Sequence, residues 1–489
     1  MNGLHAVVSA LQDSGVKMVT GVPGFPITEL MEALKDPVLK YGNSPRHEWS
    51  VNEKVALEIA LGSSVCGERS AVITKHVGMN ILADPLVTSA THTIGAGVVI
   101  IAGDDPGIQK SQNEQDSRFY GLVAEAPVFD PSTPETAYLC IKEAFLLSEK
   151  VRTPVIIRLT DRLLEKEGKI TRKRSASNTA LPLGKKMWQL TMRGKHQRFH
   201  SESFPEMCEY AENSKLNTYT KKSDIGIISS GFPASLVDSI VSPDFSHLSL
   251  TIVNPLPLDL INRFISGHKR VLVVEETEPV IEKQLSGKVL GKLTGHLPYG
   301  MVEIKDIQKA IGDIKKDNVT RKITPETIKK RGARPLCEDC PYLPLYKAVK
   351  KLNVPVAGDL GCSILTSSPP LSLLDAAFSL GSSIGTACGF NRKGIAIIGD
   401  FGLAHSGIQG LINAVHKGHE VVVIVLQNEV AAMTGGQEVA DLTELVRSYI
   451  KDTEIIAPQS DIEISALLKK KLKASGISVL LARARCPRF

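Results

Sequence analysis

The feature that most constrains this chain is a strand–helix–strand pattern within residues 394–428. Two apolar runs of strand length, Ile395 to Ile398 and Val421 to Leu426, flank a segment with apolar residues at helical spacing, namely Ile408, Leu411, Ile412 and Val415. A strand, a helix and a second strand in this order favour two parallel strands of one sheet. The pattern therefore predicts an open α/β sheet, in which ligands bind at the carboxyl ends of the strands.

Polar residues stand where both of these strands end. Asp400 follows Gly399 after the first strand, and Asn428 follows the second. Because the ends of adjacent parallel strands meet at one edge, Asp400 and Asn428 are expected to offer two oxygens to one Mg²⁺, whose other positions go to water and phosphate. Gly399 and Gly402 leave room for a diphosphate at the N-terminus of the helix, where free N–H groups favour anions.

This pattern resembles the fingerprint of thiamine diphosphate (TPP) enzymes. In that fingerprint the Asp, the Asn and the backbone carbonyl two residues after the Asn, here Val430, hold the metal on the diphosphate. The residue after the Asp is usually Gly or Ser and is Phe401 here. From the residues alone, an ordinary Gly-Asp turn stays open as an alternative. The predicted cofactor contacts in this part of the chain are Gly399, Asp400, Phe401, His405, Asn428, Val430, Thr434 and Gly435.

The bulk properties of the chain set its class. Its 489 residues, 43% of them hydrophobic, suffice for several domains, and no apolar run approaches a membrane span. The start is typical of an amphipathic helix and not of a signal peptide. The net charge of +6 comes largely from residues 165–198 and 315–334, which are interpreted as solvated linkers because aromatics do not interleave with the charges. We predict a cytoplasmic α/β protein that binds neither nucleic acid nor membrane.

Alternating strands and helices predict three doubly wound α/β domains joined by two linkers. The expected boundaries are a first domain at 1–163, a linker at 164–222, a second domain at 223–313, a linker at 314–334 and a third domain at 335–489. The first linker is expected to be largely irregular. In the first domain the polar segment SQNEQDSR, residues 111–118, is predicted to be a loop at a ligand edge.

Glu53 is the candidate catalytic carboxylate. TPP becomes reactive when a carboxylate shielded from water bonds to its aminopyrimidine ring, and a second domain usually supplies that group. Glu53 stands at the start of a helix beside small residues, although a first-turn glutamate is also favoured by the helix dipole alone. His76 and Asn80 are further catalytic candidates that are equally well explained as loop residues bonded to neighbouring backbone.

Four of the eight cysteines are candidates for metal binding. Cys337 and Cys340 form a C-x-x-C, Cys362 follows a strand in GDLGC, and Cys486 lies near Phe489. In a reducing compartment this pattern suits zinc or an iron–sulfur cluster better than a disulfide, with a chance C-x-x-C as the alternative.

Several segments together resemble the large subunits of indolepyruvate ferredoxin oxidoreductases, a family of TPP-dependent 2-oxoacid oxidoreductases. The similarity covers nearly the whole chain and is carried by SVNEKVALE, VGMNILADPL, SQNEQDSR, VVEETEP, GDLGCS, FSLGSSIGTACGF, HSGIQGLINAV and AMTGGQ. It implies a pyrimidine-binding domain, a transketolase C-terminal-like domain and a diphosphate-binding domain, in the order predicted above.

The resemblance also implies roles for residues. Glu53 becomes the carboxylate on the aminopyrimidine, and Asp400, Asn428 and the Val430 carbonyl become Mg²⁺ ligands. The cysteines named above become the ligands of a [4Fe–4S] cluster that accepts electrons, while coenzyme A takes the acyl group as a co-substrate. The family implies a small second (beta) subunit, a separate ferredoxin and a hetero-oligomer built on a homodimer.

The sequence departs from the family pattern at four places. It ends at Phe489 without the ferredoxin-like domain of the family, so electrons are expected to leave through another protein. Phe25 replaces a Thr near the substrate, which leaves the 2-oxoacid open. CEDC replaces Cys-Pro-Gly-Cys, and the added carboxylates are expected to lower the cluster potential. Cys486 is followed by Pro instead of preceded by it, which makes it the least secure ligand.

The leading hypothesis is the catalytic subunit of a TPP-dependent 2-oxoacid oxidoreductase acting on an arylpyruvate such as indolepyruvate. The first alternative keeps TPP but releases an aldehyde without oxidation, as a decarboxylase does. The second alternative is a catalytically weakened subunit with a structural or regulatory role, suggested by Phe25 and Phe401.

Overall fold

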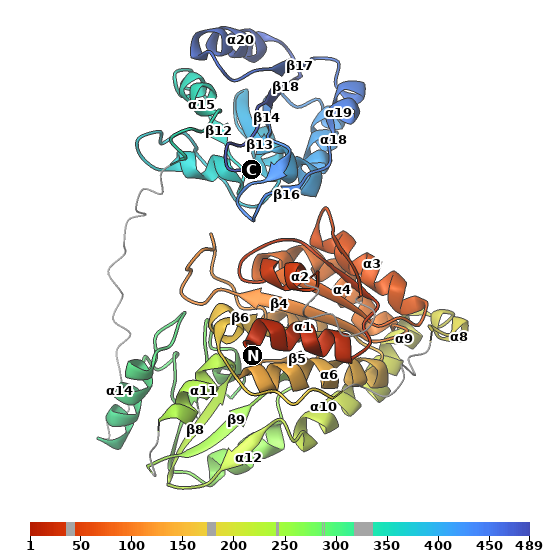
Figure 1. Ribbon diagram of the computed structural model, residues 1–489, viewed down its shortest axis with the longest axis vertical. Coiled ribbons are helices and arrows are strands. Elements are labelled where there is room, and N and C mark those ends of the chain that lie inside the picture. The colour runs from red at the N-terminus through yellow and green to blue at the C-terminus, as the bar shows by residue number, and fades with distance from the viewer. Residues whose placement is uncertain (36–44, 174–181, 241–243, 286, 288, 317–335) are drawn as a thin grey trace. The chain divides into compact units, whose positions relative to one another are not determined.

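A computed structural model describes residues 1–35, 45–173, 182–240, 244–285, 287, 289–316 and 336–489. The chain forms two compact units, Met1–Pro325 and Glu326–Phe489, and each is treated by itself (Figure 1). Most of the predicted linker at 314–334 lies outside the described residues. The fold is a mixed α/β fold built on parallel sheets, as predicted.

The larger unit is organised around a seven-stranded sheet with the order β10-β5-β6-β4-β3-β1-β2. Its strands pair in parallel except for β10, which runs antiparallel to β5. The sheet is composed of β1 (Met18–Gly21), β2 (Arg46–Trp49), β3 (Ser70–Lys75), β4 (Val98–Asp104), β5 (Val128–Phe129), β6 (Val155–Thr160) and β10 (Ile252–Asn254). A 3₁₀ turn, η2 (His76–Gly78), follows β3 directly.

Helices cover both faces of this sheet. One face packs against α1 (Gly3–Asp13) and α6 (Pro134–Val151), and the other against α3 (Glu53–Val65) and α4 (Met79–His92). Alternate residues of β4 enter the two cores, because successive side chains of a strand point to opposite faces. Three short helices complete this part, namely α2 (Thr28–Ala33), α5 (Phe119–Ala124) and α7 (Asp161–Glu165).

The segment 164–222 is more regular than the sequence suggests. It contains α8 (Lys185–Trp188), α9 (Met192–Arg198), the π-helical turn η3 (Phe199–Ser203), α10 (Phe204–Asn213) and β7 (Thr218–Thr220). Phe199, Met207 and Ala211 are fully buried in the core that α1 and α6 share. Apolar residues such as these are few in the segment and lie among many charged residues. For this reason the sequence predicts a largely irregular segment.

A second sheet of the same unit has the order β11-β8-β9-β7. It is built from β8 (Ile225–Ser230), β9 (Ser246–Leu250) and β11 (Arg270–Val274), with β7 as an antiparallel edge. Its helices are α11 (Phe232–Ser239), α12 (Leu258–Ser266), α13 (Val280–Gln284) and α14 (Ile304–Lys315). One hydrophobic core runs from α3 and α4 to α12 and β11, and β10 joins the first sheet, so the two sheets share their packing.

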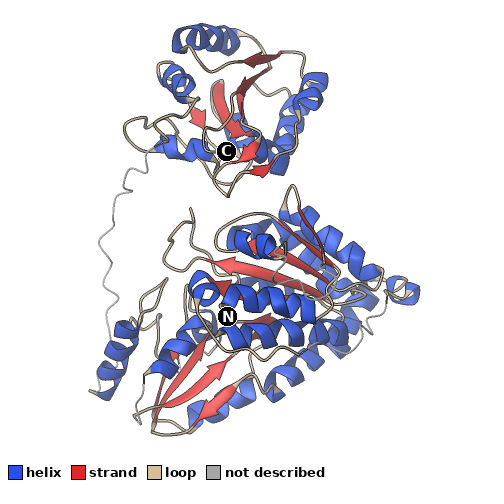
Figure 2. Cartoon of the chain, viewed as in Figure 1, coloured by secondary structure: helices blue, strands red, loops and turns tan. Residues whose placement is uncertain are grey.

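The smaller unit is a five-stranded parallel sheet with the order β12-β13-β14-β18-β17 (Figure 2). Its strands are β12 (Val356–Ala357), β13 (Gly394–Gly399), β14 (Val421–Gln427), β17 (Thr453–Ile456) and β18 (Ile477–Arg483). The 3₁₀ segment η4 (Cys362–Ser367) follows β12, and a separate antiparallel pair is formed by β15 (Val430–Ala431) and β16 (Gln437–Glu438).

Both faces of the smaller sheet are covered, which accounts for the continuous apolar sequence of β14. The helices α15 (Leu343–Lys350) and α20 (Asp461–Lys473) pack on one face. On the other face lie α16 (Ser383–Cys388), α18 (Ile408–Lys417) and α19 (Thr443–Tyr449). Within the described part of the chain, no helix is both long and apolar enough to cross a membrane.

Candidate functional site

Asp400 is the first residue of a helix that begins where β13 ends. Residues 400–417 form one helical run of α17 (Asp400–Gly402), the π-helical turn η5 (Leu403–Gly407) and α18. The sequence pattern predicts a turn at Gly402 and Gly407 before the helix, and that prediction is wrong because both glycines are themselves helical. The Asp400 carboxylate accepts hydrogen bonds from the backbone N–H of Asn428 (2.9 Å), Glu429 (2.7 Å) and Phe401 (2.8 Å). These bonds fix the carboxylate between the end of β14 and the start of the helix.

Two further oxygen-bearing groups, the Asn428 amide and the Val430 carbonyl, lie beside this carboxylate. When the Asn428 amide nitrogen points inward, it donates to Oδ1 of Asp400 at 3.1 Å and to the carbonyl oxygen of Val430 at 3.2 Å. In the opposite orientation of the amide, the side-chain oxygen of Asn428 takes the place of the nitrogen. The oxygens of Asn428, Asp400 and Val430 then face one another with no hydrogen-bond donor between them. Such a set repels itself unless a cation lies between the oxygens, and Mg²⁺ prefers this kind of ligand. The donor set therefore fits the predicted metal.

Burial raises the pKa of Asp400 to about 6, and the backbone N–H groups of Glu429, Phe401 and Asn428 act in the opposite direction. The side chain is largely hidden from solvent, with 9% exposed. A carboxylate that loses hydration in this way gains more from a divalent cation than an exposed one does, because the effective dielectric constant is lower. The electrostatics of the site thus favour a bound metal.

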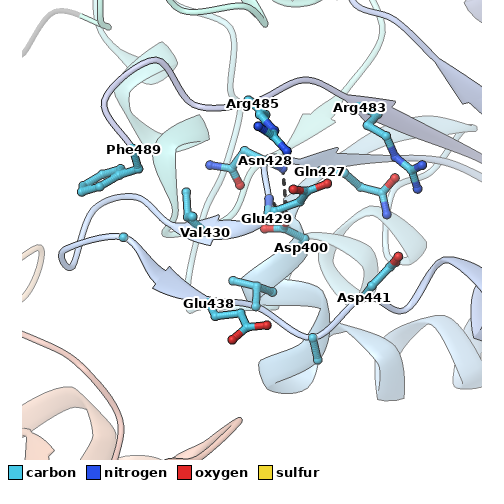
Figure 3. Close-up of a pocket in the computed structure, with 13 residues that line it drawn as sticks. Asp400, Gln427, Asn428, Glu429, Val430, Glu438, Asp441, Arg483, Arg485 and Phe489 are labelled. Carbon is cyan, nitrogen blue, oxygen red and sulfur yellow. Dashed lines mark hydrogen bonds between the residues drawn. The ribbon is translucent and has the colours of Figure 1, made fainter.

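A cavity of about 490 Å³ opens beside Asp400 (Figure 3). Its charged lining residues are Asp400, Glu429, Glu438, Asp441, Arg483 and Arg485. A Cβ added at Gly399 would meet no heavy atom within 4 Å, so the backbone there is open to a close ligand. The cavity has the size and the cation-binding edge that a diphosphate requires.

The loop after β15 places the predicted glycines next to this cavity. Gly435 and Gly436 have φ values of +121° and +79°, which side chains rarely adopt, so glycine is required at both positions. Thr434 Oγ1 bonds to the carbonyl oxygen of Ala431 at 3.2 Å and to Gln437 Oε1 at 2.9 Å. Of these residues, Gly436 lines the cavity directly.

Phe401 and His405 lie on the first turns of the same helical run, with ring centroids 6.2 Å apart. His405 is 4% exposed, and its Nδ1 lies 3.2 Å from Oγ of Ser406. It stands in the π-helical turn, a form that is rare and concentrated at functional sites. Neither of these two predicted cofactor contacts lines the cavity beside Asp400.

The four candidate cysteines gather from three segments of the smaller unit. Burial, together with the charges of Cys340, Cys486 and Cys337, raises the pKa of the Cys362 thiol to about 12. The Cys340 N–H donates to the Cys337 carbonyl oxygen at 3.1 Å, and all four cysteines are free. Among the described residues, no three His, Cys, Asp or Glu side chains converge on one ion.

In the larger unit, Glu53 begins α3 with its side chain 6% exposed. Asn52 caps the helix by accepting from the Val55 N–H at 2.9 Å. A Cβ at Gly78 would lie 2.5 Å from Oε1 of Glu53 and 2.2 Å from Oγ1 of Thr74, so glycine is needed for the carboxylate to lie there. The carboxylate is thereby held at the carboxyl edge of β3.

The other two catalytic candidates are engaged within the protein. His76 is fully buried, with Nε2 2.8 Å from the Asn113 carbonyl oxygen and Nδ1 3.3 Å from that of Gly103. Asn80 donates to Gln115 Oε1 at 3.1 Å and accepts from the Tyr120 hydroxyl. Both therefore bind the 111–118 segment, His76 through Asn113 and Asn80 through Gln115.

Sequence reasoning missed Asp359, although it repeats the pattern of a strand followed by Gly-Asp. Asp359 is fully buried after β12 and accepts from the Gly381 N–H at 2.6 Å and from the Leu360 N–H at 2.9 Å. A Cβ at Gly402 would lie 2.0 Å from its Oδ2. This carboxylate therefore packs under the helix that Asp400 begins. Burial raises the pKa of Asp359 to about 6.

Comparison with known proteins agrees with this geometry. Residues 1–120 match the family of thiamine pyrophosphate enzymes, N-terminal TPP binding domain, and residues 359–476 match the C-terminal TPP binding domain. The first match includes Glu53, and the second includes Asp400, Asn428 and Val430.

Relatives match almost the full chain. Indolepyruvate oxidoreductase subunit IorA of Methanothermobacter thermautotrophicus is 33% identical over 99% of this chain and 86% of its own length. The same subunit of Archaeoglobus fulgidus is 30% identical over 99% of this chain and 86% of its own length. A solved 2-oxoglutarate:ferredoxin oxidoreductase from Magnetococcus marinus has 14% identity and a TM-score of 0.48, covering 64% of this chain and 65% of that one. This chain, with both TPP-binding domains, belongs to the family of indolepyruvate oxidoreductase subunits IorA.

Proposed function

We propose that this chain is the catalytic subunit of a TPP-dependent 2-oxoacid:ferredoxin oxidoreductase. It would convert a 2-oxoacid and coenzyme A to an acyl-CoA, CO₂ and a proton, while two one-electron ferredoxins are reduced. The observation that carries the proposal is the set of oxygens from Asp400, Asn428 and Val430 in a chain related to IorA along nearly its whole length. The name of those relatives favours indolepyruvate as the 2-oxoacid.

Residues of both units would contribute to the reaction. Asp400, Asn428 and the Val430 carbonyl would hold Mg²⁺, and the open backbone at Gly399 would lie against the diphosphate. TPP, when bound, supplies the carbanion that attacks and decarboxylates a 2-oxoacid. Glu53 would hold a proton on the aminopyrimidine at a buried position, where it exchanges that proton without competition from water.

The metal role of Asp400 predicts a specific loss in Asp400→Asn. The substitution keeps the size of the side chain but removes its charge and one metal-binding oxygen. Because removing residues that only support metal ligands costs about 10- to 100-fold in affinity, we expect at least that loss in Mg²⁺-dependent TPP binding. Calorimetric titration of TPP at several Mg²⁺ concentrations measures it.

The matched control is Asp441→Asn, another carboxylate lining the same cavity outside the oxygen set. We expect TPP affinity to stay within about threefold there, as is typical for an exposed charge. Equal losses in the two variants would mean that cavity charge, and not metal coordination, governs binding.

The cysteines predict an iron–sulfur cluster. Cys337, Cys340, Cys362 and Cys486 are the proposed ligands, and a cluster there would accept electrons one at a time. Anaerobically purified protein is expected to contain about four irons and matching acid-labile sulfide per chain, with an EPR signal after dithionite reduction. Cys362→Ser should lose the signal, whereas Cys388→Ser should keep it, since Cys388 lies apart in the α16 core. A signal that survives in Cys362→Ser contradicts this ligand set.

The overall function is tested with the protein and a small second subunit expressed together, the arrangement that we propose along with a separate ferredoxin. The expected result is reduction of a viologen dye that requires indolepyruvate, coenzyme A, TPP and Mg²⁺. Absence of dye reduction with iron and TPP both bound would contradict the proposal.

A further inference from the structure

Lys75 is a cation at the carboxyl edge of the large sheet, and among the described residues it has no hydrogen-bond or ion-pair partner. It is the last residue of β3 and pairs in register with Gly103 of β4. No described residue donates to, accepts from or forms an ion pair with its ammonium group. Burial lowers the pKa of Lys75, and the charge of Asp105 only partly opposes this shift.

Asp105 is the nearest candidate counter-ion, but it is committed elsewhere. Its Oδ1 accepts from the Gln109 N–H at 3.0 Å. Its Oδ2 accepts from the N–H groups of Lys110 (3.0 Å) and Ser111 (2.8 Å) and from the Ser111 hydroxyl (2.5 Å). The Asp105 carboxylate thus closes the loop at 105–111. The three N–H groups of the Lys75 ammonium have no acceptor among the described residues and can donate hydrogen bonds to a ligand.

The turn that carries Phe25 holds Lys75 in place. A Cβ at Gly24 would lie 3.0 Å from Cβ and 3.2 Å from Cδ of Lys75, so the lysine stem lies directly against the Gly24 backbone. A Cβ at Gly103 would lie 2.4 Å from Ile27, which fixes the same turn on β4. The partly exposed ring of Phe25 has the Lys110 ammonium 4.5 Å from its centroid.

Glu53 lies on the other side of the short turn that follows Lys75. The Glu53 carboxylate contacts Gly78, three residues after Lys75, and Thr74 precedes Lys75 directly. The proposed proton-holding carboxylate and the unpartnered cation therefore share one edge of one sheet. An unpaired, partly desolvated ammonium is costly, and a bound carboxylate would offset that cost.

We propose that Lys75 binds the carboxylate of the 2-oxoacid substrate. This inference rests on the proposed function, which makes the substrate a small carboxylate that reacts near Glu53. The diphosphate of the cofactor has its own cation site at Asp400, so the substrate carboxylate is the anion left for Lys75. Lys75 is a positioning residue here, since it orients the oxoacid by its charged end.

The first test measures binding without turnover. Surface lysines of the wild-type holoenzyme are labelled with trinitrobenzenesulfonate, and the label at each lysine is quantified by peptide mass spectrometry. Indolepyruvate is expected to protect Lys75, while its neutral ethyl ester should not. Lys17, at the opposite edge of the sheet beside β1, should be labelled equally with both. Equal protection of Lys75 by acid and ester, or no protection by either, overturns the proposal.

The second test is kinetic. Lys75→Met is expected to raise KM for the 2-oxoacid about 10- to 100-fold, the value of a charged hydrogen bond, with TPP affinity unchanged. Lys75→Arg should recover part of that loss, and Lys17→Met should change neither parameter. An unchanged KM in Lys75→Met overturns the assignment. Carboxylate-specific protection of Lys75 in a protein that turns over no 2-oxoacid would instead keep this binding site and contradict the proposed function.

Discussion

Glu53→Gln is expected to lower turnover about 100- to 10,000-fold while leaving TPP affinity near the wild-type value. Glutamine keeps the shape of the side chain and can still bond to a ring nitrogen, but it cannot exchange the proton that activates the cofactor. Glu53 is only 6% exposed and lies against Gly78, so water cannot easily replace it. Anaerobic dye-reduction kinetics and calorimetric TPP titration, run on the same preparation, separate the two effects.

The same helix supplies the control. Glu58 lies on α3 with its side chain 48% exposed and forms an i,i+4 ion pair with Lys54 at 3.5 Å. Glu58→Gln is therefore expected to keep turnover within about twofold, because exposed ion pairs contribute little. Wild-type turnover in Glu53→Gln would show that another group activates the cofactor. A parallel loss of turnover and TPP affinity would show that Glu53 only holds the cofactor.

Arg118→Met is expected to give the largest loss of stability in the larger unit, about 3–5 kcal/mol. Arg118 is 1% exposed and binds Asp116 (2.6 Å) and Glu275 (2.8 Å) through its guanidinium. It also donates to the backbone carbonyls of Glu276 (2.6 Å) and Glu278 (2.9 Å). Methionine would fill much of the volume but would leave the buried Glu275 without its cation and Asp116 with only Arg158, 3.9 Å away.

The pKa directions agree with this expectation. Burial raises the pKa of Glu275, and the Arg118 charge is the strongest influence that holds this pKa down. Removing Arg118 should push Glu275 toward its protonated form, so the variant is expected to lose less stability in mildly acidic solution than at neutral pH. Hydrogen exchange of the β11 amides, followed by mass spectrometry, measures the change in local unfolding free energy.

Arg46→Met is the comparison for this experiment. Arg46 pairs with Glu68 at 2.8 Å, but its side chain is 71% exposed, so a change below about 1 kcal/mol is expected. If Arg118→Met changed the unfolding free energy by no more than Arg46→Met, the buried ion pairs would not be what joins the two sheets of the larger unit.

The network around Arg118 also shows what the sequence could not reveal. Strands with a continuous apolar sequence, such as β13 and β14, agree with the sequence-based prediction within one residue, because a run of apolar residues of strand length is a local signal. The sequence of the charged segment 111–118 predicts a loop at a ligand edge. Its last residues, Asp116, Ser117 and Arg118, are instead buried, and two of them bind groups more than 150 positions away. Arg118 binds Glu275 at a separation of 157 positions, and Asp116 accepts from the Glu278 N–H at a separation of 162. No local sequence pattern predicts an ion-pair partner that is so distant along the chain.

The same limit applies to the candidate site. The strand–Gly-Asp pattern predicted where Asp400 and Asn428 meet, since parallel strands end at one edge. It did not distinguish Asp400, whose oxygens face a cavity, from Asp359, which is sealed under the helix. The polar character of His76 suggested chemistry, but both of its ring nitrogens lie against backbone carbonyls contributed by distant segments. A single lysine after a strand is common, so the sequence pattern at Lys75 does not indicate a binding role.

The most direct test of the central claim is the identity of the product. Indolepyruvate is incubated anaerobically with the assembled enzyme, TPP, Mg²⁺, coenzyme A and oxidised ferredoxin, and the products are separated by liquid chromatography with mass spectrometry. The account predicts indoleacetyl-CoA in a ratio of one to two with reduced ferredoxin, and no product when coenzyme A is absent. Indoleacetaldehyde formed at full rate without coenzyme A or ferredoxin would contradict it and identify the chain as a non-oxidative decarboxylase.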